Sequence, residues 1–73
     1  MHYNSPGKTH REKHWVRVNN GPDSEGKNRA HKWCNDNPST GNFYHFYAAP
    51  TWWFENSEDA LLFKLKWCNL DYK

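Results

Sequence analysis

The fold is decided by one stretch, Thr51-Trp52-Trp53-Phe54-Glu55-Asn56-Ser57-Glu58-Asp59-Ala60-Leu61-Leu62-Phe63-Lys64-Leu65-Lys66-Trp67. It contains three of the five tryptophans of the chain and three of its four leucines. No other part of the sequence has enough apolar residues to start a hydrophobic core. We therefore expect the rest of the chain to pack against this stretch.

The stretch reads as an extended aromatic strand, residues 51–55, that leads directly into a capped helix. Asn56 or Ser57 fits the N-cap, where a side-chain oxygen accepts a free backbone N–H of the first turn. Glu58 and Asp59 follow, where the positive end of the helix dipole favours carboxylates. Asn56 and Asp59 also approximate a capping box, with Asp in place of the usual Glu or Gln.

The end of this helix is ambiguous in the sequence. Residues 63–67 alternate apolar and charged side chains with a period of two, which favours a strand. No Gly, Pro or Asn occurs between Ser57 and Cys68, which favours one unbroken helix. We expect the helix, because a strand would need a chain reversal without a turn residue. Its buried stripe would then contain Leu61, Leu65 and Cys68, with Ala60, Phe63 and Trp67 beside it and Lys64 extending its charge toward solvent.

The preceding residues supply two further strands and a helix. Residues 14–18 are rich in β-branched and aromatic side chains and predict a strand that ends at the turn signals of 19–23. A helix over 25–36, with Ser24 as its N-cap, would bury Ala30, Trp33 and Cys34, which share one helical face. Residues 42–48 predict the second strand, joined to the third by a turn at Ala49-Pro50.

Together these elements predict an α+β domain of order β-α-β-β-α. It would have a three-stranded, mostly antiparallel sheet with two helices on one face. Residues 1–12 contain Pro6-Gly7 and no periodic apolar side chains, and we interpret them as a flexible basic tail. Residues 13–73 then form the single domain.

Composition limits the function classes. The chain has 73 residues, of which 18% are aromatic, so the core of this small domain must consist mainly of Trp, Tyr and Phe. The net charge is +2; residues 1–36 carry seven Lys and Arg against four acids. This basic front half permits a weak contact with nucleic acid but lacks a dense basic patch. No apolar run could span a membrane and no secretion signal is present, so we expect a cytoplasmic protein with reduced Cys34 and Cys68.

The predicted sheet has more aromatic side chains than one core needs. Two helices can cover only one face, so the other face would expose a partner-binding cluster. Its predicted members are Trp15, Arg17, Phe43, His45, Tyr47 and Trp53. Exposed aromatics with an Arg are typical anchors for a protein partner. The same rings could instead stack on unpaired bases, or several could simply be core residues.

The sequence also contains two histidine-based pairs. His31-x-x-Cys34 lies on one face of the predicted helix, and His10-x-x-x-His14 has the same property if helical. A structural zinc site usually has two close-set ligand pairs with more cysteines, so we interpret these residues as surface histidines and a buried thiol, and expect no metal and no cofactor. No nucleophile motif and no phosphate-binding glycine loop is present, so we do not expect an enzyme.

One sequence pattern extends this interpretation. Trp52-Trp53-Phe54-Glu55, followed by Glu58-Asp59-Ala60-Leu61-Leu62-Phe63-Lys64-Leu65-Lys66-Trp67, resembles small bacteriophage proteins in which an aromatic strand leads into an E-D-A-x-x-F-K-L-[KR]-W helix. The match covers about sixteen of 73 residues. The length and the aromatic-rich, His-rich composition are similar to those of small host-takeover regulators of Xanthomonas lytic phages.

The resemblance implies a protein that acts in the cytoplasm of the host bacterium, and we expect a monomer. It implies binding to the N-terminus of the β′ subunit of bacterial RNA polymerase, interference with sigma-dependent promoter recognition, and read-through of intrinsic terminators. It carries over no functional residue, so the site residues above rest on the exposed-face argument alone. The alternative function is a single-stranded nucleic-acid-binding module that uses the same aromatic face.

Overall fold

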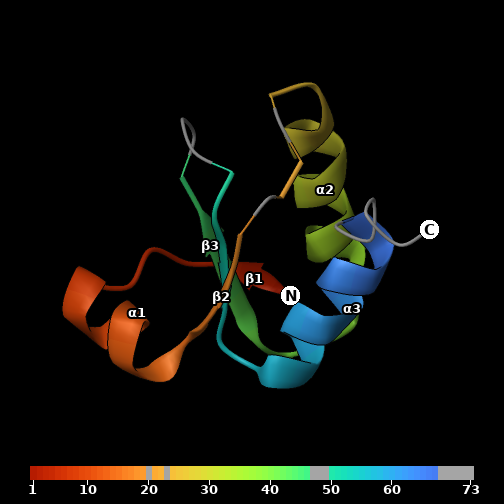
Figure 1. The fold of residues 1–73 in the computed structure, drawn as a ribbon. Helices are drawn as coiled ribbons and strands as arrows, with labels where there is room; N and C mark the ends of the chain where they lie inside the picture. Colours follow the sequence, from red (N-terminus) through yellow and green to blue (C-terminus); the bar gives the residue numbers. More distant parts are fainter. Residues whose placement is uncertain (20, 23, 47–49, 68–73) are drawn as a thin grey trace.

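The computed structural model describes residues 1–19, 21–22, 24–46 and 50–67, with the side chains of residues 24 and 25 left out. These residues form an α+β fold with a four-stranded mixed sheet (Figure 1). In chain order the elements are β1 (His2–Tyr3), α1 (Lys8–His14), β2 (Val16–Val18), α2 (Ser24–Asp36), β3 (Asn42–His45), β4 (Trp52–Phe54) and α3 (Ser57–Trp67). The fold class is as predicted, with one more strand and one more helix.

The sheet has the strand order β1-β3-β4-β2. The pairs β3–β4 and β4–β2 are antiparallel, as the hairpin of the second and third predicted strands requires, and β1 joins β3 in parallel. The register places Tyr44, Trp53 and Arg17 in one row across the three strands. The neighbouring rows contain Phe43, Phe54 and Val16, and His45, Trp52 and Val18, and these point to the opposite face.

Helices lie on both faces of the sheet. In Figure 1, α2 and α3 lie on one side of the strands and α1 lies on the other. We call the face under α2 and α3 the inner face and the face under α1 the outer face. The prediction of two helices on one face is correct for α2 and α3 and omits α1.

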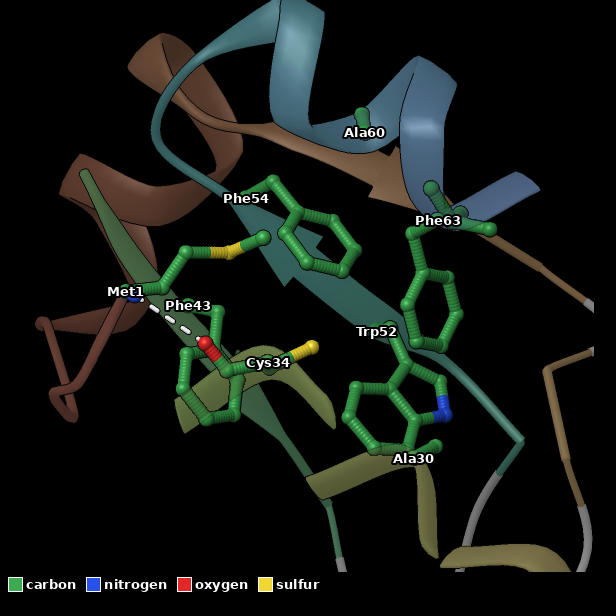
Figure 2. Close-up of a cluster of buried hydrophobic side chains, with 9 residues drawn as sticks. Met1, Ala30, Cys34, Phe43, Trp52, Phe54, Ala60 and Phe63 are labelled. Carbon is green, nitrogen blue, oxygen red and sulfur yellow. Dashed lines mark hydrogen bonds between the residues drawn. The ribbon is translucent and has the colours of Figure 1, made fainter. Parts of the chain in front are cut away.

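The inner face holds the hydrophobic core (Figure 2). Phe63 of α3 packs against Trp52 and Phe54 of β4, with ring centroids 4.7 and 4.9 Å apart. From the other side, α2 contributes Ala30 and Cys34, which are fully buried. The remaining buried members are Met1, Val18, Phe43 and Ala60. As the composition predicts, aromatic rings fill most of the core volume.

The N-terminus of α3 is fixed by polar contacts that the sequence predicts in part. The backbone N–H of Ala60 donates to the carbonyl of Asn56, which identifies Asn56 as the N-cap residue. The Asn56 amide lies 3.4 Å from the carboxylate of Asp59, and the hydroxyl of Ser39 donates to the same carboxylate at 2.8 Å. The buried Asp59 therefore joins the start of α3 to the loop before β3.

The whole of 57–67 is helical, so the predicted unbroken helix is confirmed over these residues. The predicted buried stripe is wrong. Ala60 and Phe63 are buried and Trp67 is half-buried, whereas Leu61 and Leu65 are exposed. The contacts of Asp59 with Ser39 and Asn56 turn the face of residues 59, 60 and 63 toward the sheet, so the leucines point outward. Cys68 lies outside the described residues.

The predicted boundary between a tail of residues 1–12 and a domain of 13–73 is absent from the structure. The backbone N–H groups of His2 and Asn4 donate to the carbonyls of Gly41 and Phe43, both at 3.0 Å, and this places β1 at the edge of β3. The Met1 side chain enters the core. These contacts join segments about forty residues apart in the sequence. Because the N-terminal residues themselves have no periodic apolar pattern, the sequence analysis interpreted them as a tail and missed β1.

Two other predicted boundaries shift slightly. The strand predicted over 14–18 begins at Val16, because His14 still belongs to α1 and the N–H of Trp15 donates to the carbonyl of Arg11. The helix predicted over 25–36 is α2, and Ala30 and Cys34 are buried as expected while Trp33 is half-buried beside them.

Candidate functional site

The structure does not bring the predicted site residues together on one exposed face. Arg17 and Trp53 lie in one row of the outer face, and Phe43 and His45 lie on the inner face. Phe43 is fully buried, and Trp15 and Trp53 are only 8% and 6% exposed. Tyr47 lies outside the described residues. The alternation within each strand was predicted correctly, but the register between strands, which the sequence does not encode locally, separates the members.

The outer face carries an aromatic and cationic cluster around Arg11 of α1. The Arg11 guanidinium lies 5.2 Å from the ring of Tyr44, 4.9 Å from that of Phe46 and 5.1 Å from that of Trp53. Arg17 lies 5.9 Å from Trp53 and is exposed. Such contacts stabilise a desolvated guanidinium by about 2 kcal/mol. Arg11 is 7% exposed, so this face is covered by α1 and is not an open aromatic surface.

A second polar cluster lies where α2 meets β3. The Nδ1 atom of His31 is 3.0 Å from the Nε2 atom of His45, so one imidazole donates and the other accepts. The ring of Tyr3 lies within 5.4 Å of both imidazoles, and its hydroxyl donates to the carbonyl of His45 at 3.2 Å. His45 also stacks on Trp52 with a centroid distance of 4.1 Å. Burial lowers the pKa of His45, and the neighbouring His31 and Lys27 act in the same direction.

The thiol of Cys34 is inert in this setting. Burial raises its pKa to about 12; the Asp59 carboxylate acts in the same direction and the amino group of Met1 opposes it. A nucleophile or metal ligand must be a thiolate, so Cys34 is suited to neither role here. Cys34 is fully buried and faces the core, so it is the buried thiol that the sequence analysis expected. Within the part of the chain that the structure describes, no three His, Cys, Asp or Glu side chains gather around a common point.

Among the described residues, three exposed leucines lie together on α3. Leu61, Leu62 and Leu65 are 57%, 48% and 59% exposed, and we call these three residues the leucine surface. The exposed Lys64 and Lys66 lie in the same two turns. Sequence reasoning missed this surface because it assigned Leu61 and Leu65 to the buried stripe of the helix. The sequence did contain a sign of this surface. Two faces of the predicted helix are apolar, and a helix packed on a sheet buries only one of them.

Comparisons of the chain with protein-family models, with curated proteins and with solved structures found no match. Among the described residues, no helix has the length and apolar character needed to cross a membrane.

Proposed function

We propose that this protein is a phage-encoded regulator that binds host bacterial RNA polymerase at the N-terminus of the β′ subunit. It acts as a monomer in the host cytoplasm and as a stoichiometric binder rather than as an enzyme. Bound to the polymerase, it interferes with sigma-dependent promoter recognition and promotes read-through of terminators. The choice of partner rests on the resemblance of residues 52–67 to small phage regulators.

The leucine surface is the observation that supports a protein partner. Three leucines about half exposed on two consecutive turns form an apolar patch, and exposed apolar patches often mark protein interaction sites. The leucine surface lies within the segment that resembles the phage regulators, whose other apolar residues, including Ala60 and Phe63, serve the core. A helix that divides its apolar residues between a core and an open face is suited to helix-mediated docking.

The alternative of an aromatic platform for single-stranded nucleic acid has less support. Base stacking needs exposed ring faces. Phe43, Trp52 and Trp53 are all at most 6% exposed, and the outer face is occupied by Arg11. The exposed Lys8 and Lys13 of α1 remain available for a secondary contact with nucleic acid.

The test is retention of RNA polymerase from a nuclease-treated bacterial lysate by the immobilised protein. We expect all polymerase subunits in stoichiometric amounts, and at least a tenfold loss in a Leu61→Ser, Leu65→Ser variant, because both side chains lie at the proposed interface. A Lys32→Ala variant is the matched control, since Lys32 is an exposed helical residue on α2. Purified polymerase should then show reduced promoter initiation and increased terminator read-through.

One result would contradict the choice of partner, and another would contradict the choice of binding surface. Absence of polymerase from the retained proteins, or its retention only when nucleic acid is intact, would reject a direct polymerase binder and favour the nucleic-acid alternative. Equal retention by the double leucine variant would leave the partner in place and remove the leucine surface as the interface.

A further inference from the structure

The His31 and His45 side chains form a site that the proposed function does not use. His31 extends from α2 and His45 from β3, so the pair joins a helix to the sheet. Their rings are almost perpendicular, with an interplanar angle of 79° and centroids 5.2 Å apart. The nitrogen atoms Nδ1 of His31 and Nε2 of His45 face each other at 3.0 Å.

This separation is close to that of two histidine ligands on one metal ion. Two nitrogens each about 2.0–2.1 Å from a tetrahedral ion lie about 3.3–3.4 Å apart. Small rotations of the two rings would therefore direct both lone pairs to a common point. The imidazole that donates in the hydrogen bond would move its proton to its other nitrogen, so both facing nitrogens become ligands.

The surroundings decide what kind of site this is. The neutral form of an imidazole is the form that binds a metal ion. Lys27 donates to the carbonyl of Phe46 at 2.8 Å, and its positive charge close to His45 weakens the binding of any cation. Both histidines are partly exposed, so the pair is accessible to water.

We propose that His31 and His45 form an exchangeable two-histidine site for a divalent transition-metal ion of the class of Zn²⁺, Ni²⁺ or Cu²⁺. Imidazole nitrogens favour these ions over Mg²⁺ and Ca²⁺, which prefer oxygen ligands. Water completes the coordination, because the described residues supply no third His, Cys, Asp or Glu ligand. The ion cross-links α2 to β3, in contrast to the closed structural zinc site that the sequence argued against.

A second histidine pair must be separated from this one in any test. His10 and His14 lie one turn apart on α1, both are exposed, and their ring centroids are 4.8 Å apart. Histidines at this helical spacing can also chelate a transition metal. The experiment therefore uses the full chain with His10→Ala and His14→Ala, which we call the background variant.

The experiment is a calorimetric titration of the background variant with NiCl₂ and with ZnCl₂ at pH 7.5. We expect saturable binding of one ion per chain and a rise of about 2–5 °C in the unfolding temperature at saturation. Adding His31→Ala should weaken binding at least tenfold and remove the rise. Adding His2→Ala, an exposed histidine on β1, should change neither.

Absence of saturable binding by the background variant would overturn the proposal. So would equal affinity in the variants with and without His31→Ala. His31 is the first residue to change because His45 also stacks on Trp52, so its removal could disturb the core. A His45→Gln variant, shown by circular dichroism to be folded, provides the second test and should lose binding equally.

Discussion

At the scale of single residues, the thiol of Cys34 should be unreactive in the folded protein. Its pKa is raised to about 12 by burial, so at pH 8 only about one thiol in ten thousand is ionised. In a Cys68→Ser variant, reaction of Cys34 with a disulfide reagent should follow unfolding and accelerate by orders of magnitude in denaturant. A rate in native buffer equal to that of the unfolded chain would show that Cys34 is not buried.

Gly41 is a second residue whose role follows from close packing. A Cβ atom there would lie 2.5 Å from the amide nitrogen of Asn56 and 2.7 Å from a carboxylate oxygen of Asp59. Gly41→Ala must displace the contacts that position the start of α3, and we expect a loss of about 1–3 kcal/mol in the free energy of unfolding. Gly7→Ala is the control, because nothing lies within 4 Å of its Cβ position. Equal denaturation midpoints for the two variants would contradict this role.

At the scale of elements, α3 should have one face that stabilises the fold and one that does not. Phe63 is fully buried between Trp52 and Phe54, so Phe63→Ala should lower the free energy of unfolding by about 3–5 kcal/mol. Leu61→Ala, on the exposed face of the same helix, should lower the free energy of unfolding by less than about 0.5 kcal/mol. Urea denaturation of both variants measures the difference. Similar losses would contradict the assignment of Phe63 to the buried face of α3 and of Leu61 to its exposed face.

The docking of α1 on the sheet depends on one side chain. Arg11 is the only buried residue of this seven-residue helix, and α1 has no side-chain N-cap hydrogen bond. Helices this short are unstable alone. Arg11→Ala should therefore increase amide hydrogen exchange throughout α1 while the amides of β3 and β4 remain protected; Lys13→Ala, an exposed neighbour, should have no such effect. Unchanged exchange in Arg11→Ala would show that other contacts hold α1.

These elements show what local sequence can and cannot predict. The capped start of α3, the β3–β4 hairpin and the apolar positions of α2 follow from side chains a few residues apart, and all were predicted. The pairing of β1 with β3, and the choice between two apolar faces of α3, depend on backbone hydrogen bonds and on the contact of Ser39 with Asp59. The candidate site was lost for the same reason, since strand register determines which aromatics share a face.

At the scale of the whole molecule, the stability of the fold should depend on the protonation of His45. Its pKa is lowered in the folded state by burial, with His31 and Lys27 acting in the same direction, and is about 6.5 in the unfolded chain. Below about pH 6.5 the unfolded chain therefore binds a proton at His45 that the folded chain does not bind. As the pH is lowered further, the free energy of unfolding decreases until the pH passes the folded-state pKa of His45. Above this range the contribution of His45 is constant.

The measurement is urea denaturation between pH 5 and pH 8 for three chains. The natural sequence should lose stability as the pH falls through this range, and His45→Gln should lose less, because the titrating group beside Trp52 is gone. His2→Gln, which replaces an exposed histidine, should retain the pH dependence of the natural sequence. Because the chain contains four other histidines, the informative quantity is the difference in slope between the two variants. Parallel curves for the natural sequence and His45→Gln would mean that His45 does not link protonation to folding.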